Sequence, residues 1–250
     1  MSGVTIKSKR EIELMRDAGK LLAEVHLKLA EVVVPGISTL EINRICEEMI
    51  RKSGSIPSFL GYEGYPASVC VSINDEVVHG IPKADRFVED GDIVSLDIGL
   101  IHNGYQSDAA RTHAVGNVSK EALALIKVTE ESFFEGVKQA RAGNHLYDIS
   151  AAIGNYCMNR GYGVVRELTG HGIGTEMHED PAIPNFPQRR KGMLLCAGMT
   201  FAIEPMINIG RADVVFGDDG WRCTTADGSL SAHYENTILI TDGDPEILSL

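Results

Sequence analysis

The stretch Asp97–Asp108 reads DIGLIHNGYQSD and decides the fold. Apolar and polar residues alternate on both sides of Asn103-Gly104, a dipeptide typical of two-residue turns, so the stretch predicts a hairpin of two strands. In a regular hairpin the positions whose numbers add to 207 face each other, which places Asp97 opposite Ala110 and diagonal to Asp108. Two carboxylates this close repel each other, so the pair needs a shared proton or a cation.

The composition is that of a globular protein with a substantial core. The chain has 250 residues, of which 44% are hydrophobic and 23% are charged. Its net charge of −12 argues against binding to nucleic acid or an anionic membrane, and the one basic run, Arg189–Lys191, is interpreted as a solvated loop. Five scattered cysteines, no signal sequence, and apolar runs too short to span a membrane predict a cytoplasmic protein with reduced thiols.

The helix pattern occurs twice. Amphipathic helices are predicted over residues 8–32 and 38–53, before the hairpin, and over 119–141 and 146–160, after it. Adding 107 to Gly36, Gly54 or Asp97 gives Gly143, Gly161 or Glu204, and this offset favours two related halves at about 8–118 and 119–250. We therefore predict one α+β domain over residues 1–250, a curved, mainly antiparallel sheet backed by four helices around a pseudo-two-fold axis.

Four acidic residues lie in or beside predicted strands: Asp97, Asp108, Glu204 and Glu235, the last of them in a single strand predicted over residues 231–240. Each one alone fits a solvent-facing strand position. Buried together without partners they would cost many kcal/mol, and no run of Lys or Arg lies nearby in the sequence. Two divalent cations would balance the charge, and oxygen ligands favour manganese, iron or cobalt over a structural cysteine-zinc site.

An imidazole would complete such a ligand set. His171 lies in a glycine-rich loop, GHGIG, while His79 and His178 lie in turns flanked by glycine or proline, so these three are the candidates. The other histidines carry no motif and are interpreted as structural: His26, His102, His113, His145 and His233. Paired metal ions acidify a water molecule and polarise a carbonyl, so the pattern predicts hydrolysis.

With these residues in place, the chain resembles the type I methionine aminopeptidases of the short bacterial kind over nearly its whole length. The matching motifs are Val77–Pro82, Gly91–Asp97, Ser107-Asp108, Gly170–Gly174, Phe201–Pro205 and Ser231–Thr237. The resemblance implies the pita-bread fold and two divalent metal ions, which are cobalt, manganese, iron or zinc. It also implies removal of the initiator methionine from nascent polypeptides whose second residue is small.

The resemblance implies a role for each candidate. Asp97 would chelate one ion, and His171 and Glu204 the other. Asp108 and Glu235 would bridge the two ions. Glu204 would also act as the acid and base that carries a proton to the leaving amine.

Two further histidines and a pocket complete the implied site. His178 would hydrogen-bond the scissile carbonyl, and His79 the backbone nitrogen on the leaving side. The methionine pocket corresponds to Tyr62, Tyr65, Cys70 and Trp221, for which ordinary core packing is the competing interpretation. The chain departs from the family pattern at two pocket positions, Phe59 and Met177, where we expect methionine still to be accepted.

Two other functions stay open. A proline-directed peptidase of the aminopeptidase P or prolidase type shares the fold and ligands, but such enzymes usually carry an additional amino-terminal domain. A non-catalytic homologue that binds partners would have lost ligands, whereas all five positions are intact here. The resemblance further implies contact with the ribosome near the exit tunnel, for which Arg189–Lys191 is a weak candidate patch, and we expect a monomer.

Overall fold

The predicted hairpin lies at the centre of the computed structural model, which describes residues 3–250. Strands β4 (Ile93–His102) and β5 (Tyr105–Ala114) pair in a single register over their full length, with Asp97 opposite Ala110 and Asp108 opposite Gly99. Asn103 and Gly104 both have positive φ, 50° and 84°, as a two-residue hairpin turn of this hand requires. The predicted register is therefore confirmed.

Four helices follow the predicted order. They are α1 (Lys9–Val32), α2 (Thr39–Lys52), α3 (Lys120–Val137) and α4 (Leu146–Met158). The Ser8 side chain caps α1 together with Glu11, as the sequence predicts. Helix α3 ends four residues before the predicted end at 141, because the chain leaves the helix to pair with the C-terminal segment, where the Ala142 amide donates to the Thr241 carbonyl at 3.1 Å.

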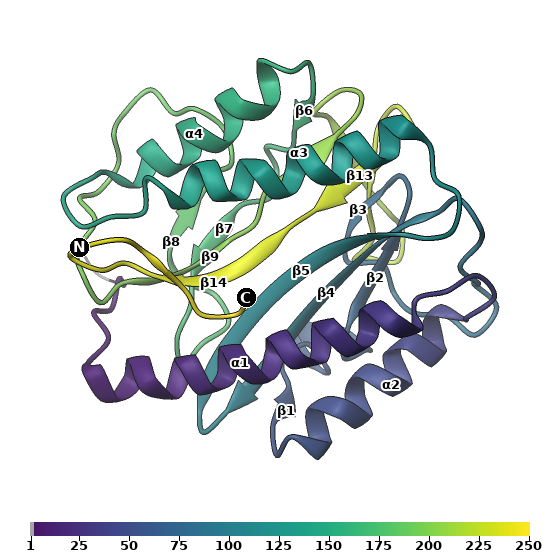
Figure 1. The fold of residues 1–250 in the computed structure, drawn as a ribbon, viewed down its shortest axis with the longest axis horizontal. Helices are drawn as coiled ribbons and strands as arrows, with labels where there is room; N and C mark the ends of the chain where they lie inside the picture. The colour runs from purple at the N-terminus through teal and green to yellow at the C-terminus, as the bar shows by residue number, and fades with distance from the viewer. Residues whose placement is uncertain (1–2) are drawn as a thin grey trace.

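A curved antiparallel sheet of nine strands carries the hairpin. Its order is β1-β4-β5-β14-β9-β7-β8, with β2 paired to β4 and β15 paired to β14. Its other strands are β1 (Ile56–Pro57), β2 (Cys70–Ile73), β7 (Gly170–Gly172), β8 (Glu179–Ile183), β9 (Thr200–Ile203), β14 (Glu235–Leu239) and β15 (Glu246–Ile247). Figure 1 shows β14, from the end of the chain, lying between β5 and β9, so that the two halves of the chain share one sheet.

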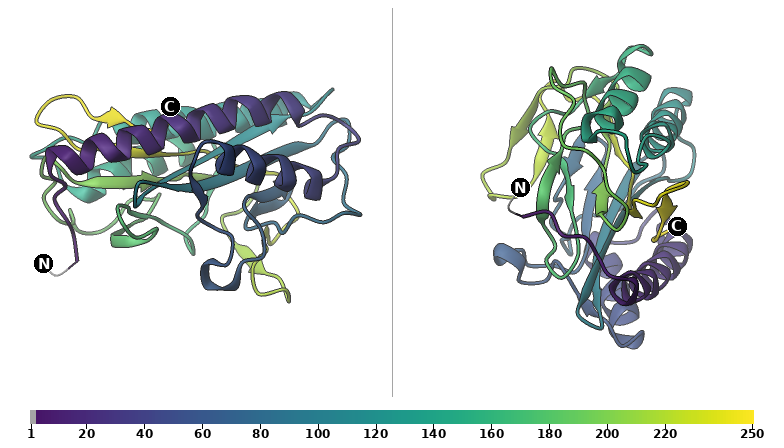
Figure 2. Two further views of the ribbon diagram at one scale, coloured as in Figure 1. Left: turned by 90° about the horizontal axis from the view of Figure 1, so that it is seen from below. Right: turned by 90° about the vertical axis from the view of Figure 1, so that its left-hand side faces the viewer.

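Two three-stranded sheets flank the large one. They have the orders β13-β10-β6 and β11-β12-β3. Their strands are β3 (Glu76–Val78), β6 (Gly163–Val164), β10 (Met206–Asn208), β11 (Val214–Phe216), β12 (Cys223–Thr225) and β13 (Ser231–His233). In Figure 2, α1 in purple and the α3–α4 pair in teal lie on the same side of the large sheet.

The strand predicted over residues 231–240 is in fact two strands. β13 pairs with β10 in the small sheet, and β14 pairs with β5 and β9 in the large one, with the break at Tyr234. A matching break separates β9 from β10 at Glu204-Pro205, where proline removes the amide that a continuing ladder would need. At each break the chain passes between the large sheet and the small one, which places Glu204 and Glu235 at the boundary between them.

The core consists of several apolar clusters, of which the two largest follow the predicted halves. One packs α1 and α2 against the first strands through side chains such as Leu22, Ile42 and Leu96. The other packs α3 and α4 against β9 and β14 through Phe133, Ile149 and Phe201. The division of one domain into related halves at about 8–118 and 119–250 stays a prediction.

Helix α1 approaches the C-terminal segment at Gly19. A Cβ atom at this position would lie 2.1 Å from the backbone carbonyl oxygen of Leu248. Gly19→Ala should therefore lower the free energy of unfolding by about 1–3 kcal/mol, because overpacking outweighs the gain of about 1 kcal/mol in helix propensity. Urea denaturation measures the change, with Lys28→Ala on the exposed face of the same helix as the control. A more stable Gly19→Ala protein would contradict the packing described here.

Candidate metal centre

Five neighbouring strands of the large sheet supply the five predicted ligands. Asp97 lies in the middle of β4 and Asp108 in β5. Glu235 begins β14, Glu204 directly follows β9, and His171 is the central residue of β7. Because the strand order is β4-β5-β14-β9-β7, each strand contributes one side chain to the same region. All five side chains line a single cavity of about 190 Å³.

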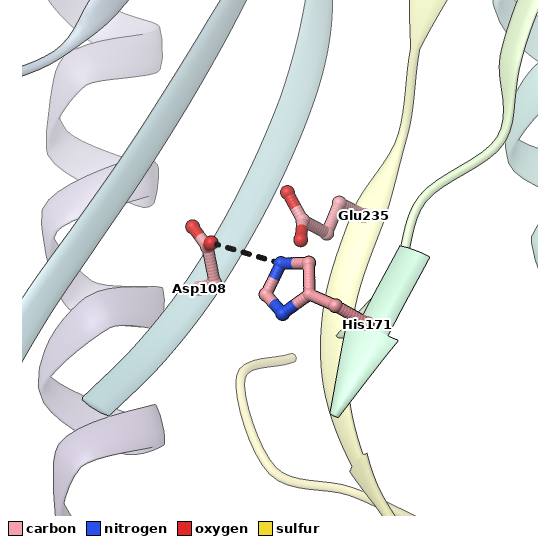
Figure 3. Close-up of side chains that lie close together, drawn as sticks. All are labelled: Asp108, His171 and Glu235. Atoms are coloured by element: carbon pink, nitrogen blue, oxygen red, sulfur yellow. Dashed lines mark ion pairs between the residues drawn. The ribbon is translucent and has the colours of Figure 1, made fainter. Parts of the chain in front are cut away.

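The His171 ring lies among the carboxyl groups. Its Nε2 atom is 3.8 Å from Asp108 Oδ2 and 3.7 Å from Glu204 Oε1. Figure 3 shows one ring nitrogen directed at Asp108, with the carboxyl group of Glu235 beside it. These separations are longer than charge-assisted hydrogen bonds, and they suit donors that surround a shared ion.

Without a bound cation, burial keeps the acids protonated because it raises their pKa. It raises the pKa of Asp97 to about 7 and that of Glu204 to about 8. For Asp108 and Glu235, burial and then the neighbouring carboxyl groups raise the pKa well above the ordinary range. Four acids cannot all ionise here without added positive charge.

The chain itself supplies little of that charge. The half-buried Arg111 guanidinium is a nearby cation that the sequence pattern does not reveal, because it is not part of a basic run. It stacks on the Tyr234 ring and donates to backbone carbonyls of Ala110 and Glu235, so it does not pair with the carboxylates. One cation facing away leaves most of the negative charge uncompensated.

The donor set fits divalent metal ions. Within residues 3–250, three buried carboxyl oxygens have no hydrogen-bond donor: Asp97 Oδ1, Asp108 Oδ1 and Glu235 Oε1. Unpartnered buried oxygens are costly, whereas metal ions satisfy them directly. Four carboxylates and an imidazole form the oxygen-rich set that hard or borderline divalent ions prefer.

His171 is oriented by its own strand. It lies in β7 and not in the loop that the glycine pattern predicted, because Gly170 and Gly172 pair with β8 and β9. A Cβ atom on Gly172 would lie 2.2 Å from the Asp180 carbonyl oxygen, so glycine here permits close strand packing. Nδ1 of His171 donates to the Gly172 carbonyl at 2.9 Å, which leaves Nε2 free to face the acids.

His233, which is interpreted from the sequence as structural, lies beside the acids of this site. His233 is 1% exposed, and its Nε2 atom lies 3.5 Å from Glu204 Oε2 and 3.9 Å from Glu235 Oε2. It is the last residue of β13, two positions before Glu235. The two-residue period of strands was the available signal, because it directs residues two positions apart toward the same side.

The two predicted substrate histidines both line the cavity. The His79 ring meets Trp221 edge to face at 6.2 Å, and its backbone has a positive φ of 61°, an uncommon conformation outside glycine. His178 packs edge-on against the His171 ring at 4.4 Å, and its Nδ1 atom is 2.7 Å from the Tyr62 hydroxyl. Burial lowers the pKa of both, to about 4 for His79, so both imidazoles are neutral at pH 7.

The predicted pocket residues line the same cavity as the acids. They are Phe59, Tyr62, Tyr65, Cys70, Met177 and Trp221. Cys70 sits opposite Asp97 in the β2–β4 pairing, which joins the apolar pocket directly to the acidic cluster. Further lining residues that the sequence did not single out are Glu63, Val78, Leu168, Thr169 and Met206. Val78 belongs to the motif Val77–Pro82, whereas the other four carry no motif and only the tertiary fold brings them to the cavity.

Phe59 and Met177, the two departures from the family pattern, meet at Gly99. A Cβ atom on Gly99 would lie 2.8 Å from both Met177 Cε and Phe59 Cε1. Glycine on β4 therefore makes room for two large apolar side chains in the pocket wall. The pocket wall is therefore apolar at both positions, as we expect for a pocket that accepts methionine.

Comparisons with known proteins agree with this site. The model of metallopeptidase family M24 matches residues 13–242. A methionine aminopeptidase of Clostridium acetobutylicum is 53% identical over 247 residues, which cover 99% of each chain. The crystal structure of methionine aminopeptidase from Rickettsia prowazekii superposes with a TM-score of 0.97 at 40% identity and covers 99% of this chain and 100% of that one.

A proline-directed relative is more distant. The Xaa-Pro dipeptidase from Bacillus anthracis gives a TM-score of 0.76 at 26% identity, and although 98% of this chain is covered, only 61% of that chain is. The shared fold thus extends to proline-directed peptidases, whereas the full-length matches at high identity are to methionine aminopeptidases. This chain belongs to metallopeptidase family M24 and, within it, to the methionine aminopeptidases of the short bacterial form.

Proposed function

We propose that this chain hydrolyses the peptide bond after an N-terminal methionine and prefers substrates with a small second residue. The observation that carries the proposal is the single cavity in which four acids and His171 adjoin an apolar pocket. The acids alone would suit several metallohydrolases. The pocket, built from aromatic rings, Cys70 and Met177, adds the selectivity for an unbranched apolar side chain.

The five donors would hold two divalent ions. Asp97 would bind one ion, His171 and Glu204 the other, and Asp108 and Glu235 would bind both. Bound ions of this kind lower the pKa of a water molecule and polarise the scissile carbonyl. The substrate's free amine would complete the coordination, which accounts for cleavage at the chain terminus.

Glu204 is placed to carry the proton. Its carboxyl group lies between the Nε2 atoms of His171 and His233, at 3.7 Å and 3.5 Å. A carboxylate at this place, within reach of a metal-bound water molecule, can accept a proton and give it up again. Glu204 would take the proton from water and deliver it to the leaving amine.

The neutral histidines would position the peptide. With the Tyr62 hydroxyl donating to Nδ1 of His178, the Nε2 atom of that ring carries a hydrogen and can donate to the scissile carbonyl oxygen. His79, beside Trp221, would contact the backbone nitrogen on the leaving side. Both contacts depend on neutral rings, which burial favours.

The cellular setting is part of the same proposal. Among residues 3–250 no helix combines the length and apolar character needed to cross a membrane. All five cysteines are free thiols. We infer that the enzyme works as a monomer in the cytoplasm on nascent polypeptides, and that the exposed run Arg189–Lys191 contributes to ribosome contact. Cosedimentation with ribosomes at low and high salt tests that contact.

The substrate class is tested with two peptides. We expect the metal-loaded enzyme to release methionine from Met-Gly-Met and to leave an Xaa-Pro peptide uncut, measured with manganese, iron, cobalt and zinc titrated separately. The pocket lies on the amino-terminal side of the reacting bond, so it selects methionine there. Faster cleavage of the Xaa-Pro peptide would identify a proline-directed enzyme.

Glu204→Gln is the chemical control for this assay. It keeps the shape of the side chain but removes the group that carries the proton, so kcat should fall by about 10²–10⁴-fold. Circular dichroism checks that the fold is unchanged. Turnover within a few-fold of the wild type would remove Glu204 from the mechanism.

Gly99→Ala should narrow the methionine pocket. The added Cβ atom would displace the ends of Phe59 and Met177 into the cavity, and we expect kcat/KM for Met-Gly-Met to fall about tenfold or more. Steady-state kinetics measures the change. Gly243→Ala is the matched control, since its Cβ atom would have nothing closer than 3.9 Å. Equal kinetics in both variants would show that Gly99 does not shape the pocket.

The metal-free protein should lose stability as the pH rises from 6.5 to 8. In this range the folded acids still hold protons, since the pKa of Asp97 is about 7 and that of Glu204 about 8, whereas the unfolded chain has already released them. The unfolded state then binds fewer protons, so stability falls with pH. Buried neutral histidines make stability rise with pH, but only below about pH 6.5, where the unfolded chain binds protons on its histidines.

Thermal unfolding with and without a chelator measures this dependence. The chelated protein should show a falling Tm over this range, and the manganese-loaded protein should not, because bound cations favour the ionised acids. Glu204→Gln, which lacks one titrating group, should reduce the slope. A chelated wild type whose Tm stays level between pH 6.5 and 8 would contradict the raised pKa values.

A further inference from the structure

The acidic cluster contains a second imidazole that the five-ligand set leaves unused. His233 is buried as deeply as Glu235, and neither of its ring nitrogens has a hydrogen-bond partner among the described residues. A buried imidazole with two unpartnered nitrogens is rare in a settled core, where polar side chains find donors or acceptors. Both ring nitrogens are therefore available to a ligand.

The backbone fixes the position of His233 firmly. The His233 amide donates a hydrogen bond to Thr112 Oγ1 at 2.9 Å, and the Thr112 hydroxyl donates to the His233 carbonyl at 2.9 Å. These two bonds hold the backbone of His233 in place. Pairing of β13 with β10 places His233 opposite Met206, a residue of the cavity wall. The ring is thus held toward the acids by the sheet and not by a mobile segment.

The His233 ring lies about as far from its neighbouring carboxyl groups as the His171 ring does. Nε2 of His233 lies 3.5 Å from Glu204 Oε2 and 3.9 Å from Glu235 Oε2, while Nε2 of His171 lies 3.7 Å from Glu204 Oε1 and 3.8 Å from Asp108 Oδ2. Glu204 therefore turns one carboxyl oxygen toward each ring. Glu204, His233 and Glu235 form a group of three donors just as Asp108, His171 and Glu235 do.

These separations distinguish a shared ion from a hydrogen bond. Two ligands about 2.0–2.1 Å from one ion lie about 3–4 Å apart, depending on the angle between them. A direct hydrogen bond between an imidazole and a carboxylate is shorter, about 2.7–2.9 Å. The distances from His233 to Glu204 and Glu235 fall in the range for ligands of one ion.

We propose that His233 is a sixth side-chain ligand of the metal centre and gives a second nitrogen donor, through Nε2, to the ion held by Glu204 and Glu235. The inference rests on the proposed metal-dependent function and extends it. A second nitrogen adds no negative charge to a site that already gathers four carboxylates. It should hold that ion more tightly than five side chains alone would.

The cobalt-loaded wild-type protein gives the direct test. Each histidine bound to paramagnetic cobalt contributes one strongly shifted, exchangeable ring N–H signal to the proton NMR spectrum. We expect two such signals in the wild type and one in His233→Gln, whose amide can still donate a hydrogen bond but offers no imidazole nitrogen. Calorimetric titration should show at least about tenfold weaker binding of one ion in His233→Gln.

His113→Gln is the matched control. His113 is another histidine with an unpartnered buried nitrogen, but among the described residues it belongs to neither group of metal donors. It should keep both shifted signals and the wild-type affinity, so that a general effect of replacing such an imidazole is excluded.

The outcomes separate this inference from the function on which it rests. A wild type that binds cobalt with one shifted signal, or a His233→Gln protein with unchanged affinity, would overturn the ligand role of His233 and leave the aminopeptidase intact. A wild type that takes up no divalent ion would overturn both. The wild-type spectrum decides the matter even if His233→Gln fails to fold.

Discussion

Mutual repulsion among four buried carboxyl groups is the constraint on which the site depends. Sheet pairing drives Asp97, Asp108, Glu204 and Glu235 into one cavity, where burial opposes their ionisation. A folded chain can tolerate this arrangement by keeping protons or by binding cations. The second solution supplies the chemistry of hydrolysis, so the same electrostatic cost that weakens the metal-free fold defines the function.

The scaffold concentrates these groups by changing sheets twice. β9 gives way to β10 at Glu204-Pro205, and β13 gives way to β14 at Tyr234. At such a break the chain leaves one ladder for another, and the residues beside it face the space between the sheets. Glu204, His233 and Glu235 all lie at these two breaks, which is why they surround one point although Glu204 lies far from the other two in the sequence.

The pocket wall depends on a glycine in the same strand as Asp97. Gly99 on β4 leaves the volume that Phe59 and Met177 occupy. Cys70 and Tyr65 on the other side connect the wall to Asp97 and to the His79 turn, since Cys70 pairs with Asp97 and Tyr65 donates to the Gly80 carbonyl. Selectivity and metal binding therefore share strands β2 and β4, and a change in the wall can move a ligand.

Local signals in the sequence determined much of this protein. The Asn103-Gly104 turn fixed the register of the hairpin, and serine caps set the start of three helices, because these features depend on neighbouring residues. The family's motifs predicted five candidate ligand positions, and all five side chains line one cavity. The strand at 231–240 was predicted without its break, since the pattern of apolar residues does not tell which partner strand each part meets.

The tertiary structure alone decided what surrounds the acids. Burial of His233 against Glu204, the direction in which Arg111 faces, and the meeting of Phe59 with Met177 at Gly99 all join residues far apart in the chain. No local periodicity encodes such contacts, because they arise when separate sheets pack together. The sequence by itself determined which residues could bind metal, and the packing of the sheets decided which of them face one another.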